Sequence, residues 1–403
     1  MRAVQVDFIL RGDKMLTPEQ LEKYQIMSNK MLAKMQQDIM DRIIQGIRKA
    51  GEITSSTEYL IFRATELGMS KKYIQKKIQE NLDLSNKEIR KMYEEASKRT
   101  YSYDKSIFDI TDTNYIPYEE NEAVKSIMEA FFERTNGEMI NITKSMGFAE
   151  IINGKVTFKD MAKFYQEEMD RVFTSVYNGT STVDKAVREA TAKMSNSGLR
   201  IVDYASGNTT RIDVAVRRNI MTGLTQMQEQ ITQHNAEELG TTIFEFSWHS
   251  GFRPSHGWGG LRYDTTGKDY PTKEEVYANN GGGTMEDYNC RHSVYPTFKE
   301  VEPAYSKAEL KRLNALERQT KEWNGKQLNR YEQTQKQRQM EAKMRELRRR
   351  IDLLKQNEDI EKENIQKERI KYRALMNDYV MFSKKMGLST QKNRIYQDML
   401  GRV

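Results

Sequence analysis

The chain has 403 residues, of which 37% are hydrophobic and 31% are charged, and its net charge is +7 at pH 7. A single cysteine excludes an internal disulfide framework. Because no segment resembles a signal peptide and none reaches about 18 apolar residues, we expect a soluble protein made in the cytoplasm, without membrane contact. The low hydrophobic fraction and the six prolines favour exposed helices over one large core, and the length allows two or three domains.

The positive charge is concentrated in the last quarter of the chain. Residues 304–403 contain 25 Lys and Arg against 14 Asp and Glu, a net charge of +11, so residues 1–303 carry −4. This polarity favours an anionic partner such as nucleic acid near the C-terminal end, the alternative being a solvated helix of mixed charge.

Amphipathic helices are predicted for the first quarter of the chain. Thr17 as N-cap and Pro18 at the first helical position begin a helix over 17–49, in which apolar residues recur at helical spacing. Gly68 and the polar segment before Ser85 predict breaks in the helical pattern that follows. The expected shorter helices lie near 56–67, 70–80 and 85–99, and they complete a small helical bundle.

The middle of the chain alternates connections with helices. Residues 101–118 contain four tyrosines and a proline without helical periodicity, so we expect an extended connection. Asn153-Gly154 is a hairpin-type turn signal. A short strand and a Gly-Asn turn precede the last helix of this part, which Gly240 ends. The helices are predicted at 119–146, 158–177, 181–195 and 212–238.

Two polar motifs lie between predicted strands. In "TTIFEFSWH", Phe244, Phe246 and Trp248 alternate with polar residues, as in a half-buried strand. The motif "HSGFRPSHGWGG" begins at the end of this strand, and "DYNCRHSVY" leads into a second strand, "HSVYPTF". The Gly-rich residues 257–286 are expected to form a surface loop. The two motifs hold three of the four histidines and the only cysteine.

The segments "GLRIVDYASGNTTRIDVAVRRNIMTG", "FSWHSGFRPSHGWGG" and "NCRHSVYP" resemble the phage minor capsid protein 2 family, which is related to the Mu F-like and SPP1-like head morphogenesis proteins. The likeness extends over roughly residues 15–305 and is specific in 198–296. One departure is Gly259, where the family commonly has a Gln. The family motif corresponds to His249, Gly251, Arg253, Pro254, Ser255, His256, Trp258, Gly260, Asn289, Cys290, Arg291 and His292.

The resemblance implies a structural minor capsid protein of a tailed phage or prophage. Such proteins are present in few copies, are associated with the portal and other head proteins, and act in head morphogenesis with a part in DNA packaging or ejection. We therefore expect the protein in the virion, after assembly in the bacterial host cytoplasm, with no cofactor and no small-molecule substrate.

A metal site is one alternative for the two motifs. His249, His256, Cys290 and His292 form a nitrogen and sulfur ligand set suited to tetrahedral Zn²⁺. Cys290 and His292 are only two residues apart, however, and an extended segment does not easily direct both to one ion. No CxxC knuckle is present. We therefore expect no stoichiometric zinc.

Catalysis by a nuclease or toxin-like hydrolase is the second alternative. Two histidines would act as general acid and base while an arginine stabilises an anion, and a Cys–His nucleophile pair is also conceivable. The candidate residues are His249, Arg253, His256, Arg291 and His292. Because nothing in the sequence identifies a substrate pocket, we do not expect an enzyme.

We favour a structural interpretation of the motifs. The arginines would pair with carboxylates or carbonyls, Gly251 and Pro254 would fix the turn, and Cys290 would be a small buried group. The cluster would then join the end of one strand to the start of another. On this interpretation, removal of a paired and partly buried Arg253 costs on the order of 3–5 kcal/mol.

The last hundred residues are predicted to form a separate basic arm. A heptad pattern runs from 340 to 386 without a break, although three glutamates occupy its core positions. The run "RELRRR", 345–350, would place four arginines on an exposed surface, where they could bind phosphates and give non-specific contact with DNA. A chain that ends near Pro303 is accordingly expected to stay folded.

The expected fold is mainly α with a small α+β module. It comprises an N-terminal helical bundle, a small motif-bearing α/β domain, and a long C-terminal charged helix or coiled coil. The domain ranges are 1–117 for the helical region, 118–303 for the helical and α/β minor-capsid (Mu F-like) domain, and 304–403 for the basic arm.

Overall fold

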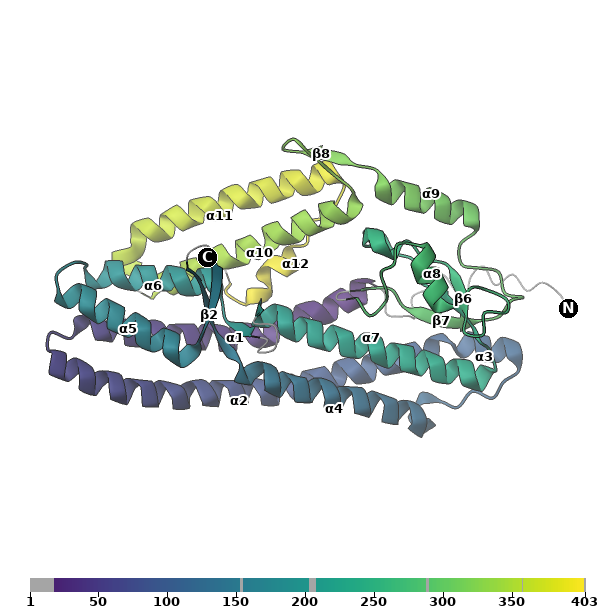
Figure 1. Cartoon of the computed structure of the whole chain (residues 1–403), viewed down its shortest axis with the longest axis horizontal. Coiled ribbons are helices and arrows are strands. Elements are labelled where there is room, and N and C mark those ends of the chain that lie inside the picture. Colours follow the sequence, from purple (N-terminus) through teal and green to yellow (C-terminus); the bar gives the residue numbers. More distant parts are fainter. Residues whose placement is uncertain (1–17, 153–154, 203–207, 288–289, 357, 402–403) are drawn as a thin grey trace. The chain divides into compact units, whose positions relative to one another are not determined.

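The computed structural model describes residues 18–152, 155–202, 208–287, 290–356 and 358–401, and over these residues the protein is mainly helical with small antiparallel sheets (Figure 1). This confirms the predicted fold class. The helices are α1 (Pro18–Glu52), α2 (Ser56–Tyr103), α3 (Lys105–Thr111), α4 (Glu122–Lys144), α5 (Met161–Tyr177), α6 (Val183–Ser197), α7 (Ile212–Leu239), α8 (Lys273–Asn279), α9 (Lys307–Arg318), α10 (Arg330–Lys355), α11 (Glu358–Met386) and α12 (Lys392–Ile395), with short 3-10 turns η1 (Tyr118–Glu120), η2 (Pro254–His256) and η3 (Tyr396–Asp398). The strands are β1 (Met146–Ile152), β2 (Lys155–Asp160), β3 (Arg200–Val202), β4 (Thr209–Arg211), β5 (Ile243–Phe246), β6 (Arg262–Asp264), β7 (Val294–Thr297), β8 (Lys321–Trp323) and β9 (Lys326–Leu328).

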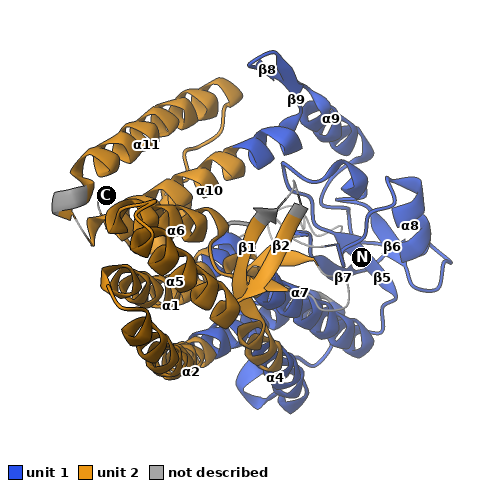
Figure 2. Ribbon diagram, turned by 60° about the vertical axis from the view of Figure 1, so that its left-hand side comes forward, with its two compact units in different colours: residues 1–25, 88–136, 218–336 blue, residues 26–87, 137–217, 337–403 orange. Residues whose placement is uncertain are grey.

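The chain divides into two compact units, and each unit is assembled from three separated segments (Figure 2). Unit 1 comprises residues 1–25, 88–136 and 218–336, and unit 2 comprises residues 26–87, 137–217 and 337–403. This division differs from the three consecutive ranges expected from the sequence. The C-terminal segment belongs to unit 2 because its polar side chains find partners there: Arg188 pairs with Glu361 at 2.8 Å, and Asn29 donates a hydrogen bond to Gln397 at 3.1 Å.

The apolar pattern predicted helix α1 correctly, but it predicted breaks in α2 that the structure does not have. The predicted stripe of α1 is buried from Leu21 to Ile47 except at the half-buried Met27 and Met31. Thr17, the expected cap, lies outside the described residues. The three shorter helices expected next are one continuous helix, α2. Gly68 is exposed and costs a helix interior only about 1 kcal/mol. Asn81 and Ser85 do not end a helix, because both are buried and the Asn81 amide donates to the Met31 carbonyl.

The expected extended connection at 101–118 is wrong for its first half. Helix α2 continues to Tyr103, and the Asp104 carbonyl accepts hydrogen bonds from Ile107 and Phe108 to begin α3. Asp112, at φ 56°, ends α3 in the left-handed conformation. The tyrosine-rich composition serves packing, because the rings of Tyr101 and Tyr115 stack with centroids 5.0 Å apart.

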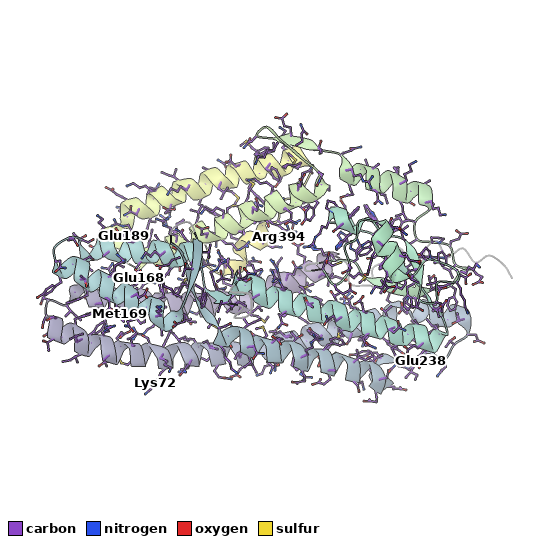
Figure 3. The ribbon with its side chains drawn as sticks, in the orientation of Figure 1. Lys72, Glu168, Met169, Glu189, Glu238 and Arg394 are labelled. Atoms are coloured by element: carbon purple, nitrogen blue, oxygen red, sulfur yellow. The ribbon has the colours of Figure 1, made fainter. Side chains whose placement is uncertain are left out.

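In unit 2, a four-stranded sheet has the order β2-β1-β3-β4. Strands β1 and β2, which were not predicted, form an antiparallel hairpin in which Ile152 pairs with Lys155. The expected turn residues, 153–154, lie outside the described residues. Helix α5 packs on this hairpin, with the Phe148 and Phe164 rings 4.4 Å apart between centroids. Glu168 of α5, labelled in Figure 3, is buried and pairs with Lys193 of α6 at 2.6 Å.

In unit 1, a three-stranded sheet has the order β6-β5-β7. The predicted strands β5 and β7 are confirmed, and Gly240 with φ 67° ends α7 just before β5. All four residues of β5 are buried, so the strand is not half-exposed as its alternating pattern indicated. The segment 257–286 is not a surface loop throughout, because it contains β6, the fully buried Trp258 and α8, which begins with a capping box at Thr272.

The C-terminal heptads form an antiparallel helical hairpin instead of one long helix. The chain turns between α10 and α11, and Gln337 donates to Ser383 at 3.0 Å while Tyr379 donates to Glu341 at 3.0 Å. The apolar core positions are buried where the two helices face each other. The buried core residues of this hairpin are Met340, Met344, Leu347, Ile351, Leu354, Ile365, Tyr379, Phe382 and Met386.

Two of the three glutamates at the heptad core positions are buried and paired with arginines. Glu361 and Glu368 are buried, and they pair with Arg188 at 2.8 Å and with Arg350 at 3.6 Å. Glu358 is exposed. The heptad period therefore identified a real packing face, whose partner is the same chain.

The arginines of "RELRRR" are not on an exposed surface, so this expectation is wrong. Arg348 is 1% exposed and forms a two-pronged pair with Asp398, at 2.6 and 3.0 Å. Arg345 donates to the carbonyl of Arg394, which is labelled in Figure 3, and Arg350 pairs with Glu368. Arg349 is buried near Asp213, and burial lowers its pKa to about 10. The interactions of these four arginines are therefore with other residues of unit 2.

Candidate functional site

Strand β5 forms the base of the site in unit 1. Phe244 and Phe246 pack in an apolar cluster with Trp258 and Tyr263. Glu245 lies between the two phenylalanines in sequence and is fully buried, where it pairs with Arg262 at 2.7 Å. Tyr295 and the backbone N–H of residue 304 also donate to Glu245, at 2.6 and 2.9 Å. The base is therefore held by an apolar cluster and a buried ion pair.

The first motif is a tight turn that leaves the end of β5. Gly251 and Gly260 have φ angles of 76° and 81°, which glycine adopts without steric cost. Pro254 begins the 3-10 turn η2, and the His256 N–H donates to the Arg253 carbonyl at 2.8 Å. Trp258 follows this turn and is buried in the core, where its indole N–H donates to the Gly283 carbonyl at 2.8 Å.

The second motif lies beside the same strand end. The Cys290 N–H donates to the Asp287 carbonyl at 3.0 Å, and Ser247 and Ser293 exchange hydrogen bonds of 2.8 and 2.9 Å. These contacts place the segment that enters β7 next to the turn that leaves β5. Ser247 and Ser293, which are 46 positions apart in sequence, are thereby brought together.

His256, Cys290 and His292 form a compact buried cluster. The Cys290 sulfur lies 3.7 Å from His256 Nδ1 and 3.5 Å from His292 Nδ1. The three side chains are 2%, 8% and 2% exposed, respectively. The Trp258 ring covers the cluster, with centroids 5.1 Å from His256 and 4.4 Å from His292. The His249 ring lies 4.3 Å from that of His292, and its Nδ1 is 3.0 Å from the Ser250 carbonyl.

Burial sets the protonation of the cluster. It lowers the pKa of His256 and lowers that of His292 well below the ordinary value, and it raises the pKa of the Cys290 thiol to about 12. His256 Nε2 lies 3.0 Å from Asp287, which also pairs with Arg253 at 3.3 Å. At neutral pH the cluster therefore contains two neutral imidazoles and a neutral thiol, with the His256 Nε2–H directed to Asp287.

This chemistry does not favour nucleophilic catalysis. A reactive cysteine needs a depressed pKa, and that of Cys290 is raised. The cavity that His292 lines has a volume of about 10 Å³, which is room for one water molecule. Small-molecule sites are usually clefts of about 300–1,000 Å³.

A comparison with protein-family models matches residues 16–381 to the family described as phage minor capsid protein 2. The chain belongs to this family. No curated protein and no solved structure matches the chain. As a phage minor capsid protein, it is a structural protein of a phage, it is located in the virion, and other phage head proteins are its partners. No helix in the described ranges is long and apolar enough to cross a membrane.

The structure of this minor capsid protein brings together most of the residues singled out in the two motifs. His249, Arg253, His256, Cys290 and His292 lie around one another as described above. Arg291 does not join the cluster through its charge: its guanidinium pairs with Glu22 of α1 at 3.6 Å. Asn289 lies outside the described residues.

The expectation that an extended segment does not easily direct Cys290 and His292 to one point is wrong. Their alternate positions in an extended segment place both side chains on one side of the chain, and the turn at η2 brings His256 to them. Gly259, the departure from the family pattern, also contributes, because a Cβ there would lie 3.0 Å from His292 Nε2. A side chain at this position would require the His292 ring to shift.

Two acidic residues of the site were not predicted. Asp287 is the first residue of "DYNCRHSVY", three positions before Cys290. Its position in that motif could have indicated a carboxylate partner for His256. Glu317 of α9 accepts hydrogen bonds from Ser250 Oγ at 2.6 Å and from the Gly251 N–H at 2.7 Å. No sequence signal indicated Glu317, because it lies 66 residues beyond its partner.

Proposed function

We propose that this minor capsid protein acts in the head morphogenesis of a tailed phage or prophage, close to the portal, and contributes to DNA packaging or ejection. The observation that supports a structural role over an enzymatic one is that the side chains of the motif are directed into the protein. His256 and His292 are buried beside Trp258, Cys290 is buried with them, and the arginines of the motif pair with Asp287 and Glu22. The match of the family over residues 16–381 supports the assignment to the phage head.

The alternative of a nuclease or toxin-like hydrolase has less support. General acid–base catalysis needs groups within reach of a substrate, whereas His256 and His292 are each 2% exposed. The small cavity beside His292 admits no nucleotide or sugar. We therefore assign the motif to the construction of the fold.

Electron microscopy of assembled particles tests the proposal. A gold or density label on the chain should be found at one vertex, in few copies, and a tagged chain should co-purify with the portal protein from particles that contain it. Label over the whole shell, on the tail alone, or in no part of the particle would contradict the assignment to the portal vertex.

Contact with DNA is proposed for the outer face of α11 instead of the "RELRRR" run. The exposed basic residues of this helix are Lys362, Lys367, Lys371, Arg373, Lys384 and Lys385. Replacing both Lys384 and Lys385 with Gln should reduce the salt dependence of duplex DNA binding by about one unit of slope per lost phosphate contact. The matched control replaces Lys71 and Lys72, an exposed pair on α2 of which Lys72 is labelled in Figure 3, with Gln. Equal slopes for both variants would exclude this face.

A further inference from the structure

We propose that His256, Cys290 and His292 are three ligands of a site for a borderline-soft divalent cation, of which Zn²⁺ is the best match. The ion would join the turn that leaves β5 to the segment that enters β7. This reverses the expectation of no stoichiometric zinc, because the spacing argument behind that expectation fails in the structure.

The distances between the donor atoms fit one ion. The three donor atoms all lie within 4.8 Å of one another. A tetrahedral zinc site with Zn–S of about 2.3 Å and Zn–N of about 2.0–2.1 Å has a sulfur-to-nitrogen edge of roughly 3.6 Å. The two edges in this cluster are 3.7 and 3.5 Å. Two of the three edges therefore already match a tetrahedral site. The third edge, between the two histidine nitrogens, lies within 4.8 Å, compared with roughly 3.3 Å in such a site, so the imidazole rings would close around the ion on binding.

The orientation of His256 is that of a metal ligand. Its Nε2 is directed to Asp287 at 3.0 Å, which leaves the unprotonated Nδ1 facing the Cys290 sulfur. Histidine ligands of metal ions commonly donate their other N–H to a carboxylate, which fixes the tautomer and the ring plane. Asp287 is held in turn by Arg253 at 3.3 Å. The arrangement of Arg253, Asp287 and His256 thus positions Nδ1 without touching the ion.

Without a bound ion, the burial of the polar side chains of this cluster costs free energy. Among the described residues, nothing forms a hydrogen bond with the buried His292 Nε2. Two glycines make room for the rings: a Cβ at Gly283 would lie 2.6 Å from His256 Cδ2, and one at Gly259 would lie 3.0 Å from His292 Nε2. Burying two imidazoles and a thiol together costs free energy unless partners compensate it. A cation held by the Cys290 sulfur and the two Nδ1 atoms would compensate those three atoms, while His292 Nε2 would keep no hydrogen-bond partner among the described residues.

The neutral imidazoles are already in the form that binds a metal ion. The thiol would lose its proton on binding, since the thiolate is the ligand form of cysteine. Zinc sites with three protein ligands take water in the fourth position. The proposal therefore requires no fourth side chain.

The test uses the untagged full-length chain, stripped with a chelator, dialysed against Zn²⁺ and then against buffer, with the metal measured by elemental analysis. We expect about one zinc per chain. Cys290→Ser and His256→Asn should lose the stoichiometric metal, while Asp287→Asn should retain it with an affinity lowered by about 10–100-fold. His234→Asn, which changes the chain's fourth histidine on α7, is the matched control and should bind as the unchanged chain does.

A second measurement covers variants that fail to fold. Co²⁺ added to the stripped, unchanged chain should give a thiolate-to-cobalt charge-transfer band, and Zn²⁺ should displace it. Bound zinc should also protect Cys290 from a thiol reagent in mild denaturant. Absence of metal after dialysis, zinc that persists in Cys290→Ser, or bound Co²⁺ without a thiolate band would each overturn the proposal.

Discussion

Arg253 and Arg262 both belong to ion pairs of unit 1, but their environments differ. The Arg253 and Asp287 side chains are 34% and 35% exposed, whereas those of Arg262 and Glu245 are 3% and 0% exposed. Arg262 also donates to the Val301 carbonyl at 2.8 Å. Solvent screens the first pair, so a cost of several kcal/mol is not expected for Arg253, contrary to the sequence-based expectation.

Replacing Arg262 with Ala should therefore destabilise the protein far more than replacing Arg253 with Ala. Removal of Arg262 leaves Glu245 buried without its ion pair, at a cost of about 3–5 kcal/mol. Removal of Arg253 should cost about 1 kcal/mol or less. Urea unfolding of the two variants measures the difference. Equal losses of stability would contradict the assignment of the structural role to the buried pair.

At the residue scale, the sequence identified the cluster but not its geometry. His256, Cys290 and His292 stood out because histidine and cysteine are rare in this chain, with four and one residues, respectively. Their convergence depends on the turn at η2 and on the room left at Gly259 and Gly283, neither of which a spacing argument contains. Arg291 was grouped with them because it is adjacent in sequence, whereas its charge pairs with Glu22.

Helices were the best-predicted elements, and their ends were the least well predicted. The starts of α1, α6 and α7 follow the apolar periodicity closely, but α2 continued through Gly68 because one exposed glycine is a weak helix breaker. The β8–β9 hairpin was not predicted, although its Asn-Gly sequence is a hairpin turn signal. Asn324 and Gly325, with φ angles of 48° and 77°, form its two-residue turn.

Substitution of Gly68 by Ala should stabilise the protein. The position is inside α2, is exposed, and has no atom within 4 Å of an added Cβ, so the change should add about 0.5–1 kcal/mol. Gly46→Ala in α1 is the matched comparison. An added Cβ there would lie 1.6 Å from the Tyr165 hydroxyl, so this change should destabilise. Thermal melts followed by circular dichroism measure both, and a lower melting temperature for Gly68→Ala would disprove the first expectation.

The heptad pattern illustrates what a periodic signal contains. Its period correctly marked one buried face on α10 and α11, from Met340 to Met386. It did not indicate the turn between them, and it gave no information on whether the partner helix belongs to another chain. Glu361 and Glu368 looked like defects because their partners, Arg188 and Arg350, are identified only by the fold.

At the scale of the whole molecule, each compact unit is built from separated segments of the chain. Composition and charge separate residues 304–403 from the rest, yet 337–403 contribute buried residues to unit 2, and Leu310 of α9 packs within unit 1. Pairing of distant segments is not encoded in local periodicity. The mainly helical class could therefore be predicted, while the assembly of the units could not.

A chain that ends at residue 303 should lose cooperative folding, contrary to the expectation from the sequence. It lacks α10 and α11, so Asp213 loses the nearby positive charge of Arg345 and Arg349, and the apolar face of unit 2 loses its cover. Circular dichroism should show a broad transition at lower temperature than that of the full chain. A sharp transition at the full-length temperature would demonstrate that the arm is dispensable.

The order in which the segments of each unit are synthesised follows from their positions. Unit 1 is complete once residue 336 has been made, whereas unit 2 needs residues 337–403. At about 5–20 residues per second, translation of this last segment takes roughly 3–13 s. During that interval the apolar faces of residues 26–87 and 137–217 have been made but lack their final cover. The nascent chain is therefore prone to aggregation through residues 26–87 and 137–217 until residues 337–403 emerge, so a stop codon at residue 337 would give an aggregation-prone product instead of a shortened functional one.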